Sequence, residues 1–286
     1  MAIVLALMTA LFFGLGDFCG GLAGRTWPVR DVILVAHVVG LVGVLGAALT
    51  LADQLLLADL LWGALGGVGG VVGLALLYRG LARGPMGVVA PLTAVMSAAV
   101  PTGWGLAVAG DHLTLPSGVA VLLAALAIIG ASSHSGDESP LTPLAILEAL
   151  LAGAGFGLMF IALDQTDPSS GAWSIVGARC TSLALLFVAF VWRTRQLPSP
   201  RRLLPNGSRS GLGLVIAVGI LDTGGNVMFL LGIQRGALSV VAILTSLYPV
   251  ITVLLARVVL RERLSSIQTF AVGLALGASV LFAAGS

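Results

Sequence analysis

The stretch GLARGPMGVVAPLT at residues 80–93 recurs as GIQRGALSVVAILT at residues 232–245, at a constant offset of 152 positions. Eight of the fourteen positions are identical. The similarity extends outward on both sides, so that residues 60–130 and residues 212–281 look like two copies of one unit. A copy of this length indicates an internal duplication, and the duplication decides the fold.

The duplication covers the whole chain once the lengths of the connections are allowed to vary. Near the start of the chain the offset is 143 or 142, and it rises to 152 across the Arg- and Pro-rich connection 193–209, which is longer than its counterpart 51–59. The matched pairs are Phe13 with Phe156, Gly14 with Gly157, Ala36 with Ala178, His37 with Arg179, Gly67 with Gly219 and Gly73 with Gly225. We therefore divide the chain into a first repeat at residues 1–132 and a second repeat at residues 143–284.

The composition predicts an integral membrane protein. Apolar residues make up 58% of the chain and charged residues only 9%, with a mean hydropathy of +1.10, whereas a soluble domain is about half apolar and about a quarter charged. At about 20 residues for each spanning helix, the apolar stretches number ten: residues 2–21, 31–51, 60–79, 86–108, 114–132, 143–163, 172–192, 211–231, 237–256 and 266–284. The predicted fold is all-α.

Each repeat holds five of these helices, and five is an odd number. The second copy must then enter the membrane from the side opposite to the first, which relates the two copies by a pseudo-two-fold axis in the membrane plane. The predicted fold class is a polytopic membrane protein of ten transmembrane helices built from two inverted five-helix repeats.

The arginines are sorted between the two membrane faces. Odd-numbered connections between the helices hold twelve arginines, whereas the even-numbered connections hold only Arg235 together with five aspartates. By the positive-inside rule, this bias places the odd connections in the cytoplasm and both termini outside. We expect a multi-pass protein of the cell membrane in that orientation.

The sequence lacks the motifs of several chemistries. All fourteen basic residues are Arg, and the P-loop that binds nucleotide phosphates requires a Lys. The chain also has no H-E-x-x-H pair, no G-x-S-x-G turn and no cluster of Cys and His. We expect no enzyme activity, no catalytic residue, no metal site, no cofactor and no nucleic-acid partner. Any energy must then come from a gradient of an ion or a solute, or from a partner.

Charged and polar residues inside the apolar spans are the candidate functional residues, because a charge at the bilayer centre costs about 3 kcal/mol on insertion scales. Asp222 and Asn226 share one face of the eighth span, and Arg179 lies at a similar depth in the seventh. Two interpretations stay open. Arg179 and Asp222 neutralise one another between helices, or they line a cavity and bind a charged substrate or carry a coupling proton.

Three further residues join this set. His37 occupies the repeat position of Arg179 and is either a packing residue or, with its ordinary pKa near 6.5, a proton-coupling group. Asp17 in the first span either faces a cavity or reaches the headgroup region. Tyr248 stands beside Pro249 in the ninth span and is a candidate substrate contact. Because proline lacks a backbone N–H, Pro249 is also a candidate for a kink, as are Pro91 and Pro101 in the fourth span.

Two stretches carry a resemblance to a known family. Residues 238–265, LSVVAILTSLYPVITVLLARVVLRERLS, and residues 87–114, which end in GDHLT, are similar to the proline-containing helix and following turn of the drug/metabolite transporter superfamily. The chain thus resembles the EamA-type ten-helix transporters of bacteria over essentially its whole length. It departs from them at Arg261, where the family usually has Gly, and at Asp111, where it usually has Glu. The resemblance also implies cytoplasmic termini, opposite to the arginine bias.

The resemblance and the duplication together imply a secondary-active transporter of a small organic solute that works in the lipid bilayer by alternating access. The most favoured activity is proton-coupled export of an amino acid or a related metabolite. One alternative is facilitated uptake of a sugar or metabolite, for which a polar and largely uncharged cavity is expected. Another is a non-transporting subunit of a larger membrane complex.

Overall fold

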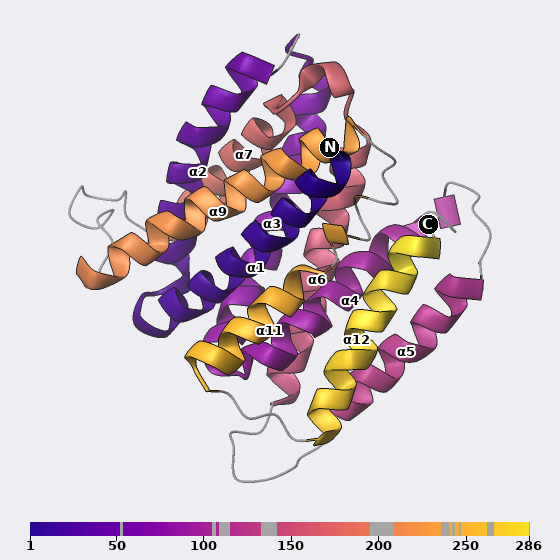
Figure 1. The fold of residues 1–286 in the computed structure, drawn as a ribbon. Coiled ribbons are helices and arrows are strands. Elements are labelled where there is room, and N and C mark those ends of the chain that lie inside the picture. The colour runs from indigo at the N-terminus through magenta and orange to yellow at the C-terminus, as the bar shows by residue number, and fades with distance from the viewer. Residues whose placement is uncertain are drawn as a thin grey trace.

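The computed structural model describes residues 1–51, 54–104, 107–108, 115–132, 142–194, 209–235, 241, 244–245, 247–261 and 266–285. Within these residues the chain forms ten α-helices and one short 3₁₀ helix (Figure 1). The first repeat contributes α1 (Ala2–Thr26), α2 (Val29–Leu51), α3 (Leu57–Arg83), α4 (Met86–Trp104) and α5 (Leu115–Ser132). The second contributes α6 (Pro143–Asp164), η2 (Pro168–Ser170), α7 (Trp173–Thr194), α9 (Arg209–Ile233), α11 (Tyr248–Val259) and α12 (Ser266–Gly285). The predicted all-α fold of ten helices is confirmed.

Six helices are long and apolar enough to cross a membrane, namely α1, α2, α3, α6, α7 and α9. They run from 20 to 27 residues in their apolar part, and about 20 residues span the roughly 30 Å hydrocarbon core. Within the described residues, the apolar runs in α4, α5, α11 and α12 are shorter, 10 to 16 residues. These helices themselves run from 12 residues for α11 to 20 residues for α12.

The ninth predicted span, residues 237–256, is described in part. Residues 241, 244 and 245 are helical, and α11 begins at Tyr248 with the turn residue Leu247 as its N-cap, so Pro249 lies in the first turn of α11. A proline there costs no hydrogen bond, because the first N–H groups of a helix have no intrahelical partner. Pro249 therefore lies at the start of α11, just after the turn at Leu247, whereas Pro91 and Pro101 lie inside α4.

The third helix of each repeat packs against the first two helices of the other repeat. Helix α3 lies along α6 and α7, and its counterpart α9 lies along α1 and α2. Likewise α4 packs on α6 and α11 packs on α1, while α5 and α12 lie side by side (Figure 1). Exchanging the repeats exchanges these contacts, as an approximate two-fold relationship requires. The division of the chain into units 1–132 and 143–284 remains a prediction.

Glycines at matched positions allow this close packing. A Cβ atom on Gly67 would lie 2.7 Å from Cα of Ala178, and one on Gly219 would lie 2.6 Å from the carbonyl oxygen of Ala36. Since Gly67 matches Gly219 and Ala178 matches Ala36, this is one contact made twice. In lipid, where apolar burial gives no preference between helices, such close backbone approach is a principal source of association.

The two membrane faces are held by different contacts. On one, which we call the Asp59 face (residues 54–59 and 165–172), the Asp59 carboxylate accepts hydrogen bonds from the Asp167 N–H, at 3.1 Å, and from the Ser170 hydroxyl. Ser169 donates its O–H and N–H to the exposed Asp167 carboxylate, which lowers the pKa of that group.

On the other face, which we call the Arg83 face (residues 24–30 and 79–86), an ion pair joins α3 to α6. Buried Glu148 meets Arg79 at 2.8 Å and Arg83 at 3.8 Å. Glu148 is thus an acid near a helix end with basic partners that reach solvent.

Candidate functional site

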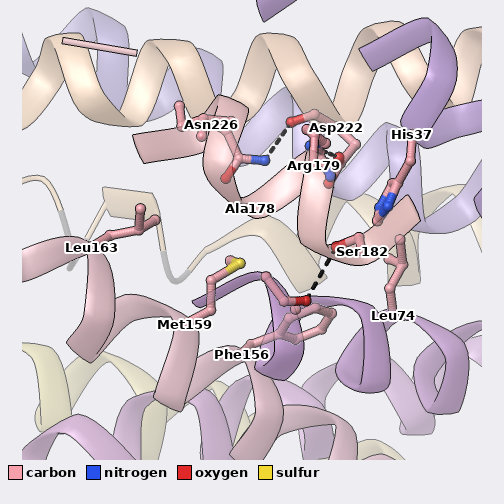
Figure 2. A pocket seen from close by; sticks show the side chains of 13 residues that line it. His37, Leu74, Phe156, Met159, Leu163, Ala178, Arg179, Ser182, Asp222 and Asn226 are labelled. Atoms are coloured by element: carbon pink, nitrogen blue, oxygen red, sulfur yellow. Dashed lines mark hydrogen bonds and ion pairs between the residues drawn. The ribbon is translucent and has the colours of Figure 1, made fainter. Parts of the chain in front are cut away.

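A small cavity lies between the long helices of both repeats. Its volume is about 40 Å³, and residues from α2, α3, α6, α7 and α9 line it (Figure 2). A water molecule needs roughly 10–15 Å³ of such volume, so this conformation has room for about three waters. The lining is polar on one side, with His37, Arg179, Ser182, Asp222 and Asn226, and mostly apolar on the other, with Leu74, Phe156, Met159, Leu163 and Ile175.

The centre of the polar side is an ion pair between α7 and α9. Nη2 of Arg179 contacts Oδ2 of Asp222, and the Arg179 side chain is 9% exposed against 20% for Asp222. Asn226 donates from Nδ2 to the backbone carbonyl of Asp222 at 2.7 Å, which leaves its own Oδ1 as an acceptor (Figure 2). The pair is thus neutralised between helices and also lines the cavity, and its part in binding or proton coupling remains a prediction.

Two polar atoms of the lining residues are buried without a hydrogen-bond partner among the described residues. They are Nε of Arg179 and Nδ1 of His37. A buried polar atom without a partner costs about 1–3 kcal/mol, so such atoms are rare unless water or a ligand meets them. Their position beside a cavity with room for water indicates a site where a polar group can bind.

The polar side of the cavity does not follow the repeat symmetry. Arg179 matches His37, but Asp222 matches Gly70, which carries no side chain. Asn226 in turn matches Leu74, which lines the cavity as an apolar residue. Both halves contribute residues, yet the ion pair belongs to the second repeat alone.

Asp17 and Tyr248 lie outside the cavity lining. Asp17 is buried in α1 within electrostatic range of Asp222, and its neighbour Gly16 packs on the Asp222 backbone. Tyr248 is buried in a small cluster, with its ring edge-on to Phe13 at 6.4 Å between centroids. The structure therefore brings together His37, Arg179, Asp222 and Asn226, and the roles of Asp17 and Tyr248 remain predictions.

Sequence reasoning missed the apolar side of the cavity and the hydroxyl of Ser182. Ser182 donates to the carbonyl oxygen of Gly67 at 3.1 Å (Figure 2), and Met159 packs over Gly70. A signal for this wall was present in the glycines of α3, because a residue without a side chain leaves space that a neighbour or a ligand can fill.

An all-helical chain of apolar spans around a partly polar internal cavity defines a polytopic membrane protein of the transporter class. The model of the EamA-like transporter family matches residues 143–284, just under half of the chain, and confirms the resemblance to EamA-type transporters there. This match implies a membrane transporter of small solutes.

The comparison with solved structures supports the same fold. A structure described as "Crystal structure of protein" has a TM-score of 0.61 and 17% sequence identity, with 98% of this chain and 95% of that chain covered. At this identity the likeness shows the fold alone. No curated protein matches the chain.

Proposed function

We propose that the protein is a proton-coupled exporter of an amino acid or a related metabolite, and that the solute binds at the Arg179–Asp222 cavity. The observation that carries this proposal is an ion pair on the cavity wall with two unpartnered polar atoms beside it. Charged groups inside the membrane are costly, and where they occur they commonly mark the path of a substrate or a proton.

The charges of the site suit a zwitterion. The guanidinium of Arg179 has five N–H donors in a planar fork that matches a carboxylate, and its Nε has no partner among the described residues. The Asp222 carboxylate can bind an ammonium group. An α-amino acid offers both groups and adds no net charge to the buried site, so its binding avoids the cost of an uncompensated charge.

The apolar side of the cavity supports a solute with a hydrophobic side chain. Phe156, Met159 and Leu163 stand opposite the ion pair (Figure 2). Methionine is flexible and adapts to differently shaped neighbours, so this wall can reshape around a side chain. A sugar offers hydroxyl groups and no charge, so it would form no ion pair with Arg179 or Asp222.

Alternating access is the mechanism that the size of the cavity supports. A volume of about 40 Å³ has no room for an amino acid, so binding requires the helices around it to move apart. Protonation of Asp222 would neutralise the carboxylate that binds the ammonium group, so that a proton and the solute would compete for Asp222. This competition would couple export of the solute to entry of a proton. In this proposal the arginine bias places both termini on the extracytoplasmic side of the cell membrane.

Flux in proteoliposomes with an imposed pH gradient tests the proposal. We expect a panel of labelled amino acids to show at least one solute that accumulates only when the gradient is present. Flux of that solute at the same rate with and without the gradient would remove proton coupling, and selective flux of a sugar would instead support the facilitated carrier.

A further inference from the structure

Glycines of α1 allow helices α1 and α3 to pack closely near the Arg83 face. Gly20 lies against the ring of Tyr78, so that an added Cβ would overlap the ring. Gly21 lies under Leu81 and Met86, where a Cβ would stand 2.8 Å from Leu81 Cβ and 2.7 Å from Met86 Cε. The missing side chains allow Tyr78 to fill the space between the helices, and this ring is only 1% exposed.

Among the residues that the structure describes, the matched position towards the Asp59 face lacks this seal. The repeat offsets place Leu163 at the position of Gly20 and Leu230 at the position of Tyr78. Helices α6 and α9, the counterparts of α1 and α3, pack far less closely in the part of the chain that the structure describes. One contact there is a stacked pair, Phe160 with Phe229, whose ring centroids are 5.9 Å apart. A leucine in place of Gly20 prevents the same close approach.

The cavity extends towards the Asp59 face. Among its lining residues, Leu163 is the penultimate residue of α6 and Ile175 the third residue of α7. Both lie near the Asp59 face. Tyr78 lies one turn of α3 beyond the lining residue Leu74, towards the Arg83 face, and within electrostatic range of Asp222 and Arg179. This places Tyr78 between the cavity and the Arg83 face.

We infer that Tyr78 packed on Gly20 is the gate that closes the cavity from the Arg83 face, and that this conformation has that gate shut. The two faces must close by different contacts, because α6 has Leu163 where α1 has Gly20. The role of this contact as a gate rests on the proposed function. The close packing of Tyr78 on Gly20 is a property of the fold, and it can be tested without any solute.

Labelling of one cysteine from each side of the membrane tests the seal. The reporter is Ser182→Cys, on the cavity wall, in a chain with Cys19→Ser and Cys180→Ser to remove the native thiols. Leu55→Cys and Thr26→Cys, both exposed, mark the Asp59 and Arg83 faces in right-side-out and inside-out vesicles. A small membrane-impermeant methanethiosulfonate is the probe. We expect the reporter to react from the Asp59 face and to be protected from the Arg83 face.

Two variants open the seal in opposite ways, since Gly20→Val adds atoms against the ring and Tyr78→Ala removes the ring. Each variant should raise the rate at which the Ser182→Cys reporter is labelled from the Arg83 face by about tenfold or more, because the open conformation becomes more populated by that factor. Tyr78→Phe keeps the ring and should keep the protection. Gly46→Ala is the matched control, because nothing lies within 4 Å of its added Cβ.

Equal labelling from both faces in the parent chain, with Gly20 and Tyr78 intact, would overturn the inference. So would continued protection in Gly20→Val or Tyr78→Ala, whichever retains the elution profile and thermal unfolding of the parent. Failure to find a transported amino acid would defeat the proposed function and leave this result standing, since labelling needs no substrate.

Discussion

Arg179 and His37 face one cavity from matched positions of the two repeats, Arg179 on α7 and His37 on α2. Only Arg179 has a carboxylate partner at the cavity, since the residue matched to Asp222 is Gly70. The scaffold is therefore nearly two-fold symmetric, while its binding groups are not. A solute near the pseudo-two-fold axis would bind to the charged residues of the second repeat. On the side of the first repeat it would contact His37.

Loss of one partner of the Arg179–Asp222 pair should destabilise the fold more than loss of both partners. Removing one partner from a buried ion pair leaves an unpaired charge and costs about 3–5 kcal/mol. We expect Arg179→Gln and Asp222→Asn each to lower the midpoint of thermal unfolding in detergent, and the double variant to recover most of the loss. Additive losses in the double variant would show that the two side chains act separately.

Coupling to protons should depend on Asp222. In Asp222→Asn the residue at the ion pair can no longer gain or lose a proton and offers no charge to an ammonium group, so we expect exchange of solute to weaken and accumulation driven by a pH gradient to be lost. Glu148→Gln is the matched control, because Glu148 pairs with Arg79 outside the cavity lining. Gradient-driven accumulation at the parental level in Asp222→Asn would eliminate the proposed role of this carboxylate.

The sequence predicted the elements and the charged part of the site for a simple physical reason. Ionised residues in apolar spans are so few that Arg179 and Asp222 stand out as partners from the sequence alone, and the repeat offset places His37 at the same depth. The apolar wall gave no such signal. In a membrane helix, residues that face lipid and residues that face protein are both apolar, so the hydropathy of Met159 or Phe156 does not reveal which way it points.

The same limit explains Asp17 and Tyr248. Sequence indicated that both lie within spans, but their direction depends on how α1 and α11 are rotated against their neighbours. The packing places the ring of Tyr248 against Phe13, and Asp17 within electrostatic range of Asp222. The turn at Leu247 before α11 was also not predicted, because hydropathy does not show where one helix ends and the next begins.

The repeated glycine contact predicts a matched pair of effects. Gly67→Ala and Gly219→Ala should each destabilise the fold by about 1–3 kcal/mol, the usual cost of overpacking, because each new Cβ meets backbone atoms of the opposite repeat. Gly46→Ala and Gly273→Ala have open space around the new Cβ and should be neutral, or stabilising by up to about 1 kcal/mol through helix propensity. Thermal unfolding of the four variants measures this, and a similar loss in all four would show that helix backbone effects dominate.

Met159 and Gly70 should set the size of the side chain that the site accepts. Sδ of Met159 lies 2.9 Å from the position that a Cβ on Gly70 would take, so Gly70→Ala must push the methionine into the cavity. We expect this variant to weaken transport of solutes with large side chains more than of small ones, whereas Met159→Ala should favour the large ones.

The change in selectivity should be about tenfold or more, since one methylene group in an apolar pocket is worth roughly 1–3 kcal/mol. Competition between a small and a large apolar amino acid in the same proteoliposomes measures the ratio directly. Leu158→Ala serves as the control, because this neighbour of Met159 is 57% exposed and points away from the cavity. If Leu158→Ala moves the ratio as far as Met159→Ala does, the wall opposite the ion pair does not contact the solute, and the apolar part of the substrate must be bound elsewhere.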